Sequence, residues 1–187
     1  MLAITNAHLI TVSYAGTIEN GTIVIDNGKI LAVGAAVAIP AEAEVIDAAG
    51  CTITPGFIDA HCHTGLFGDG IGGVHSDGNE ATDPITPHLR ALDALHPEDI
   101  AWPELVESGV TTILTGPGSA NVIGGQWICV KTQPKATVEE MVLLEPAGMK
   151  MALGENPRAV YGRANRMPST RMGNAAVLRE AFVSTQN

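Results

Sequence analysis

Basic residues, cysteines and long apolar runs are all scarce in this sequence. Only 10 of its 187 residues are Lys or Arg, against 20 Asp or Glu, and the formal net charge is −10. That charge has the wrong sign for a protein that binds nucleic acid or anionic lipid. The three cysteines form no CxxC pair and offer neither a disulfide framework nor a zinc ribbon, so we expect reduced thiols.

Membrane-spanning and secretory segments are also missing from the sequence. No apolar run approaches the roughly 20 residues that span a bilayer. The first six residues lack the basic and apolar regions of a signal peptide. Hydrophobic residues make up 45% of the chain and charged residues 16%, which is typical of a globular chain and not of a disordered one. These features predict a cytoplasmic protein.

The first 54 residues predict a small β module. β-branched residues are frequent between Leu2 and Val12, and two apolar runs at 22–26 and 29–33 flank the pair Asn27-Gly28. An Asn-Gly pair between apolar runs is a strong hairpin signal, because both central positions of a type I′ turn require a positive φ.

The rest of the chain predicts alternating strands and helices. In chain order, we expect a strand at 53–63, a lid-like loop at 64–88, a helix at 97–108 ended by Gly109, a strand at 110–115, a β segment at 127–132, a helical turn near 137–144, a strand at 149–153 and a helix at 170–182. This order is typical of βαβ units and therefore predicts an α/β fold.

The segment PGFIDAHCH, residues 55–63, is the most informative motif. Side chains two positions apart in a strand point the same way, so Asp59, His61 and His63 share one face. Two imidazoles with this spacing, near the end of a parallel strand, can reach one metal ion. Cys62 faces the other way, and we expect it to pack in the interior and not to act as a nucleophile.

This motif resembles the first-strand signature of the amidohydrolase superfamily, and other segments extend the resemblance over most of the chain. VIDAAGCTITPGFIDAHCH is similar to the start of such enzymes, SGVTTILTGPGSANVIGGQ to the second barrel strand and its loop, and MKMALGENPRAVYG to the third strand. Among the subgroups, the chain is most similar to imidazolonepropionase-like amidohydrolases. The resemblance implies a β-sandwich portion at 1–54, followed at 55–187 by the first three β/α units of a metal-bearing TIM (β/α)8 barrel.

The resemblance also implies a ligand set. His61 and His63 would be the first two ligands of one or two divalent metal ions, most often zinc. Glu155 follows the predicted third strand, where some amidohydrolases, including N-acetylglucosamine-6-phosphate deacetylases, supply a metal-binding Glu. A carboxylate is a sound third ligand for zinc. The alternative for Glu155 is a loop or helix-capping carboxylate.

Other candidate residues each have more than one interpretation. Asp59 either orients His61 from behind the metal site or is an inward structural carboxylate. Lys131 either binds a substrate carboxylate, or is itself the carboxylated lysine of some relatives, or is a solvated or salt-bridged strand residue. His75, His88 and His96 either line a pocket or lie on a surface loop.

The barrel cannot close within this chain. Only 124 residues follow His63, whereas a complete (β/α)8 barrel takes about 250. The later metal ligands and the catalytic acid/base Asp of the family would therefore lie outside the chain. The open sheet edge requires a cover, which would be a missing C-terminal half or a complementary chain. We expect the complete enzyme to form a homo-oligomer.

Three hypotheses for function follow. The first is a metal-dependent amidohydrolase that uses a metal-activated water to hydrolyse a C–N bond in a small amide, cyclic amide or amidine. The second is a catalytically inactive polypeptide that binds a complementary chain. The third, a nucleotide-binding α/β domain, is disfavoured, because more loop and no helix follows the glycines at positions 68, 70, 72 and 73.

Overall fold

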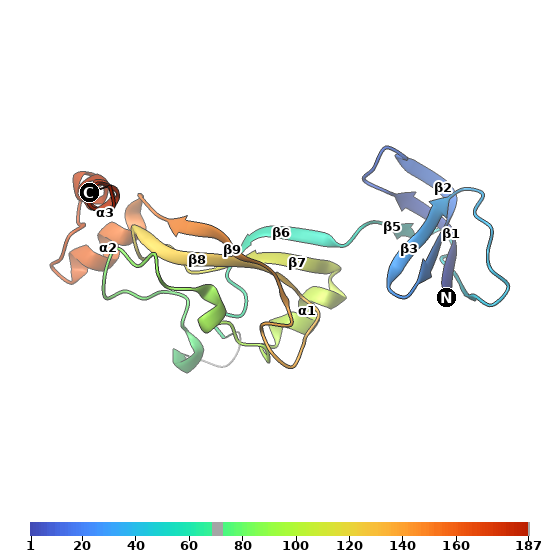
Figure 1. The fold of residues 1–187 in the computed structure, drawn as a ribbon, viewed down its shortest axis with the longest axis horizontal. Coiled ribbons are helices and arrows are strands. Elements are labelled where there is room, and N and C mark those ends of the chain that lie inside the picture. The colour runs from blue at the N-terminus through green and yellow to red at the C-terminus, as the bar shows by residue number, and fades with distance from the viewer. Residues whose placement is uncertain (69–72, 187) are drawn as a thin grey trace. The chain divides into compact units, whose positions relative to one another are not determined.

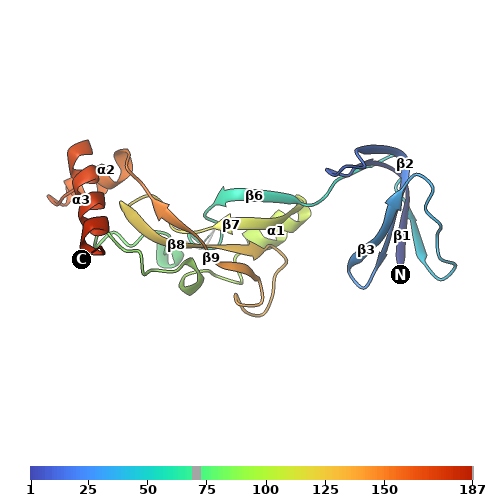
Figure 2. The same cartoon turned by 45° about the horizontal axis from the view of Figure 1, so that its top comes forward.

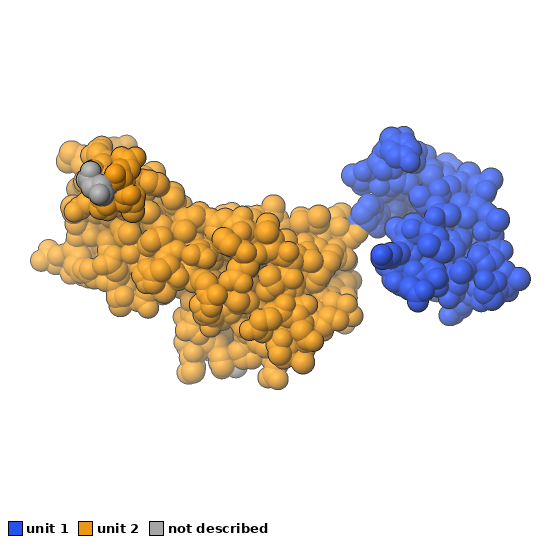
Figure 3. Space-filling view, viewed as in Figure 1, with its two compact units in different colours: residues 1–55 blue, residues 56–187 orange. Residues whose placement is uncertain are grey.

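The computed structural model describes residues 1–68 and 73–186, and its chain forms two compact units, Met1–Pro55 and Gly56–Asn187 (Figures 1 and 3). Gly70 and Gly72, two of the glycines considered above, lie outside the described residues, as does part of the loop predicted to act as a lid. None of the helices in the described part is long and apolar enough to cross a membrane.

The first unit contains one five-stranded sheet. Its strands are β1 (Leu2–Ile10), β2 (Thr17–Asp26), β3 (Lys29–Gly34), β4 (Glu44–Asp47) and β5 (Thr52–Ile53). The order is β3-β2-β1-β4, and β5 also pairs with β1. The predicted hairpin between β2 and β3 is confirmed, with a φ of 47° at Asn27 and 72° at Gly28. Among the described residues of this unit there is no second sheet to complete a sandwich.

The second unit contains a four-stranded mixed sheet. Its strands, in the order in which they pair, are β6 (Phe57–Cys62), β7 (Val110–Thr115), β8 (Ile123–Lys131) and β9 (Val142–Met151). Strands β6 and β7 are parallel, and α1 (Ala101–Glu107) lies between them in the chain, so they form one βαβ unit. The helix begins later than the predicted residue 97, because the Asp99 carboxylate accepts a hydrogen bond from the backbone N–H of Ala101.

The three successive β/α units predicted from the sequence are not what the described residues form. Strand β8 is antiparallel to both β7 and β9 and lies between them. The helical turn predicted near 137–144 is also wrong at its end, because Val142 pairs with Val130 and Leu144 with Cys129 across the sheet. These long-range pairings stabilise a strand where the local pattern indicates a turn of helix.

Two helices follow the sheet. The chain continues from β9 into α2 (Glu155–Arg163) and α3 (Arg171–Ser184), which lie together beyond the same end of the sheet (Figures 1 and 2). The predicted helix at 170–182 is confirmed, and Thr170 caps it by accepting a hydrogen bond from the N–H of Gly173. Two short 3-10 helices, η1 (Gly73–His75) and η2 (Ala91–Asp93), precede α1.

The apolar core of this unit lies on one face of the sheet. Ile113, Ile128 and Val130 are fully buried there and pack with Leu66 and Trp102. Part of the loop predicted as a lid is fixed to the sheet, because a single bridge joins Ile85 to Ile123 of β8. The opposite face of the sheet is therefore the one left for a site.

Candidate active site

Strand β6 presents its two histidines on the face of the sheet opposite the core. Cys62 packs against the core cluster, as predicted, so strand alternation directs His61 and His63 away from it. The centroids of the two imidazole rings are 5.6 Å apart. Both rings contact the indole of Trp127 on β8, with centroid distances of 4.7 Å for His61 and 5.5 Å for His63. Sequence and structure therefore agree that the two imidazoles lie side by side.

A backbone carbonyl fixes the chemistry of the His63 ring. Nδ1 of His63 lies 2.7 Å from the carbonyl oxygen of Gly116, at the end of β7. A carbonyl only accepts hydrogen bonds, so Nδ1 carries a proton, and in the neutral imidazole Nε2 then keeps a free electron pair. Gly116 is required here, because a Cβ at this position would clash with the indole of Trp127. The ring is thus held in the tautomer that a metal ligand needs.

Asp59 acts on the backbone in this structure. Its Oδ1 accepts a hydrogen bond of 3.0 Å from the N–H of His61. The contact therefore steadies the strand that carries the histidines, and no described contact joins this carboxylate to either imidazole ring.

Glu155 stands apart from the histidine pair. It is the exposed first residue of α2. Within residues 1–68 and 73–186, no three His, Cys, Asp or Glu side chains gather closely enough to hold a metal ion. The neighbouring Asn156 does donate a 2.7 Å hydrogen bond to the hydroxyl of Ser119, which ties the start of α2 to the loop after β7. That is the loop whose first residue, Gly116, contacts His63.

The remaining predicted histidines lie elsewhere. His75 and His96 contact one another, with ring centroids 5.1 Å apart, and His88 is exposed. A small pocket of about 200 Å³ opens beside His63 and is also lined by Phe67 and Asp99.

Comparison with known proteins identifies the family. No protein-family model matches the chain. The amidohydrolase tasK of Hapsidospora irregularis is 37% identical over an alignment of 177 residues that covers 87% of this chain and 18% of that protein. An adenine deaminase of Listeria monocytogenes is 32% identical over 157 residues, 83% of this chain and 22% of that protein. The crystal structure of an amidohydrolase from Thermotoga maritima MSB8 matches the whole chain with a TM-score of 0.92 and 43% identity. This chain belongs to the amidohydrolase superfamily.

The chain spans only part of the amidohydrolases it matches. It covers 48% of the Thermotoga maritima chain and about a fifth of the two curated relatives. By their names, these relatives are two amidohydrolases and an adenine deaminase.

The two lysines on the hairpin of β8 and β9 differ in their surroundings. Lys131 is an exposed residue, and its Nζ donates a 3.0 Å, partly buried hydrogen bond to the hydroxyl of Thr112 on β7, which fits its alternative as a strand residue; its role in substrate binding stays a prediction. Lys150 was not indicated by any sequence motif. Its Nζ lies 5.2 Å from the centroid of the Trp127 ring, and burial lowers the pKa of its ammonium group. The only indication of Lys150 in the sequence would have been the alternation of side chains along its strand, β9, which lies next to the strand that carries Trp127.

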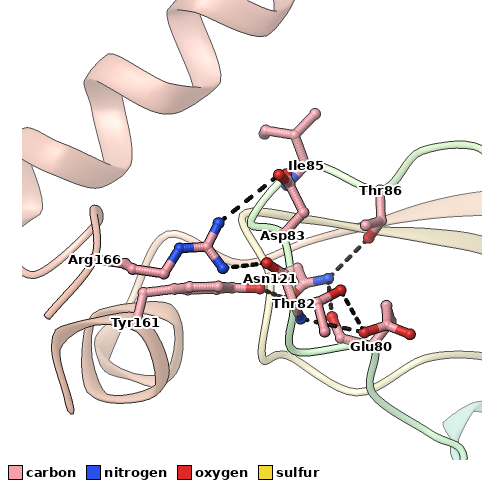
Figure 4. A network of polar contacts seen from close by, with 8 residues as sticks. All are labelled: Glu80, Thr82, Asp83, Ile85, Thr86, Asn121, Tyr161 and Arg166. Atoms are coloured by element: carbon pink, nitrogen blue, oxygen red, sulfur yellow. Dashed lines mark hydrogen bonds and ion pairs between the residues drawn. The ribbon is translucent and has the colours of Figure 1, made fainter. Parts of the chain in front are cut away.

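A buried polar network connects α2 to the loop between β7 and β8 and to residues 80–86 (Figure 4). The hydroxyl of Tyr161 donates a 2.5 Å hydrogen bond to Oδ1 of Asn121, in the loop after β7. Nδ2 of Asn121 donates in turn to the hydroxyl of Thr86 and to the carbonyl of Glu80. Tyr161, Asn121 and Thr86 are all buried, and burial raises the pKa of Tyr161 to about 12.

The exposed end of this network adds a positive charge. Arg166, in the segment after α2, donates a hydrogen bond to the carbonyl of Thr82 and lies 4.0 Å from the carboxylate of Asp83. The network thus fixes residues 80–86 and the loop after β7 relative to one another. Gly116, whose carbonyl contacts His63, is the first residue of the same loop.

Proposed function

We propose that this chain forms part of a metal-dependent amidohydrolase that cleaves a C–N bond in an amide, a cyclic amide or an amidine. The observation that carries the proposal is the histidine pair of β6. His61 and His63 lie on one face of one strand with ring centroids 5.6 Å apart, and the Gly116 carbonyl leaves Nε2 of His63 free to bind a metal.

The two neighbouring imidazoles suit a divalent metal, most often zinc, although Glu155 stands apart from them in the described chain. Zinc binds imidazole nitrogens at about 2.0–2.1 Å and favours three protein ligands plus water in catalytic sites. Two imidazoles come from β6, and we propose Glu155 as the third ligand, brought in from the start of α2. A carboxylate there would offset part of the charge of one or two metal ions. When bound, such a metal lowers the pKa of its water toward about 7 and polarises the scissile carbonyl.

The residues of this chain would then bind and orient. His63 would bind through Nε2 with its proton kept on Nδ1 by the Gly116 carbonyl, and Asp59 would keep the backbone of His61 in place. Protonation of the leaving nitrogen requires an acid, and we assign that role to an Asp outside this chain.

The sheet of the second unit supports completion by further strands. Its outer strands β6 and β9 carry large apolar side chains that are exposed, with exposed fractions of 60% at Phe57, 71% at Ile58 and 56% at Leu144. Exposed apolar edge strands favour pairing with further strands. We propose that the other half of a cytoplasmic, homo-oligomeric amidohydrolase, in the same or a complementary chain, closes a (β/α)8 barrel here and completes the sandwich of the first unit.

The test is metal-dependent hydrolysis by the complete protein. A panel of amides, cyclic amides and amidines is assayed before metal removal by a chelator, after removal, and after zinc is restored. We expect hydrolysis of at least one class, lost on removal and regained with zinc. Hydrolysis that persists in protein shown by elemental analysis to be metal-free would contradict the proposal. A zinc-loaded complete protein that hydrolyses nothing in the panel would favour the inactive binding polypeptide.

A further inference from the structure

Lys150 lies on the same face of the sheet as the histidine pair. In the register of β8 and β9, Gly125 pairs with Lys150 and Trp127 with Gly148, so Lys150 projects from the face that carries Trp127. The stem of Lys150 packs over Gly124, where a Cβ would lie 3.4 Å from its Cγ. The ammonium group ends 5.2 Å from the centroid of the Trp127 ring. At this distance the cation is attracted to the face of the indole.

Trp127 joins this ammonium group to the metal-binding candidates. The same indole contacts the rings of both His61 and His63, at 4.7 and 5.5 Å between centroids. One ammonium, one indole and two imidazoles therefore form a single cluster, which we call the Trp127 cluster. Trp127 is the residue that all three of these side chains contact.

Two hydrogen-bond donors of the Trp127 cluster lack an acceptor. Within residues 1–68 and 73–186, no hydrogen bond or ion pair reaches Nζ of Lys150. The indole Nε1 of Trp127, a residue only 5% exposed, is buried without a partner in the same residues. Buried polar groups are normally paired, and an unpaired one points to a bound ligand or another functional role. Burial also lowers the pKa of Lys150, so an anion beside it would stabilise its charged form.

Lys131 provides the contrast on the neighbouring strand. It is exposed, and its ammonium group is already bonded to the hydroxyl of Thr112. An ammonium that already has a hydrogen-bond partner, on an exposed residue, gains less from a further anion. The lysine suited to bind an anion in this chain is therefore the half-buried one over the indole.

We propose that Lys150, held over Trp127 beside His61 and His63, binds a carboxylate of the substrate, which would be an amide that carries a free carboxylate. A carboxylate accepts a charge-assisted hydrogen bond from an ammonium group, and Lys150 lacks such a partner among the described residues. The assignment of this anion to a substrate rests on the proposed amide hydrolysis. The binding event itself needs neither turnover nor metal.

The test compares two ligands that differ only in charge. N-acetylglycine carries a carboxylate, and N-acetylglycinamide is its neutral amide. Both are titrated by calorimetry into the complete protein from which metal has been removed, so that the carboxylate cannot bind through a metal ion. We expect N-acetylglycine to bind roughly 10- to 100-fold more tightly, the range that one charge-assisted hydrogen bond confers.

Three variants test whether Lys150 causes the tighter binding of N-acetylglycine. Lys150→Met should abolish it, Lys150→Arg should retain most of it, and Lys131→Met is the matched control that should leave it unchanged. Thermal unfolding verifies that each variant is folded, and Lys150→Gln replaces Lys150→Met if the latter is not. Because the metal is absent, this result is independent of whether the protein hydrolyses amides.

Several binding results would contradict the proposal. Equal binding of the two ligands by the unaltered protein would overturn it, as would a preference that survives in Lys150→Met or disappears in Lys131→Met. Titration with inorganic phosphate separates the remaining possibility. If phosphate binds in a Lys150-dependent manner and N-acetylglycine does not, the site recognises a phosphate group and the carboxylate assignment is wrong.

Discussion

The two faces of the β6–β9 sheet are built from the same strands and have opposite characters. On one face, Ile113, Ile128 and Val130 are fully buried in an apolar cluster. On the other, two histidines and a lysine surround Trp127. Alternation along each strand separates them, so a single sheet supplies the free energy of folding from one side and the chemistry from the other.

The largest expected difference between the two faces is the loss of stability on substitution of Trp102, in the core on the apolar face. Its side chain is 0% exposed, and its Nε1 donates a 2.8 Å hydrogen bond to the carbonyl of His96. Trp102→Ala should lower the free energy of unfolding by about 3–5 kcal/mol, because it leaves a large cavity. Chemical denaturation measures this loss. The matched change His61→Ala on the opposite face should cost about 1 kcal/mol or less, and an equal loss in both variants would contradict the division between the faces.

Substitution of Glu155 should have the opposite effect, a loss of turnover with little loss of stability. Glu155→Gln keeps the shape of the side chain and removes the charge that offsets the metal. Turnover of the complete enzyme should fall by at least about 100-fold, more than the roughly 10–100-fold typical of an outer-shell partner. The melting temperature should hardly change, because Glu155 is exposed. Unchanged turnover and metal affinity would make this residue a helix-terminal carboxylate.

Tyr161 tests how α2 supports the site, with a smaller effect. Tyr161→Phe removes the hydrogen bond to Asn121 and should lower the unfolding free energy by about 1 kcal/mol at neutral pH. The pKa of Tyr161 is raised from 10.0 to about 12 in the folded chain. Its unfolded form therefore loses the proton first, and stability should decrease as pH rises from about 10 to about 12. Denaturation curves at several pH values should show this additional decrease in the parent protein and not in Tyr161→Phe.

Local signals in the sequence predicted a definite part of this arrangement. Asn27-Gly28 specified a hairpin by its φ requirement, Thr170 marked the start of α3, and the HxH spacing placed two imidazoles on one face. Each of these depends on neighbours within a few positions in the chain. The resemblance to amidohydrolases was confirmed by the relatives that the chain matches.

The pairing of strands that are distant in the sequence could not be predicted from the sequence. The antiparallel insertion of β8 between β7 and β9 depends on contacts between distant segments. The surroundings of the two lysines also depend on these pairings. The pairing of β7 with β8 brings Lys131 to Thr112, and the pairing of β8 with β9 brings Lys150 over Trp127. A sequence pattern gives the alternation of a strand but not the strand beside it.

The measurement that tests the account most directly is the metal content of a double histidine variant. The untreated complete protein should hold about one or two equivalents of a divalent transition metal by elemental analysis. His61→Ala/His63→Ala should lose it, whereas the control His75→Ala/His96→Ala, a second pair of contacting rings, should keep it. An untreated protein without transition metal, or a His61→Ala/His63→Ala variant with its full content, would contradict the assignment of the site to β6.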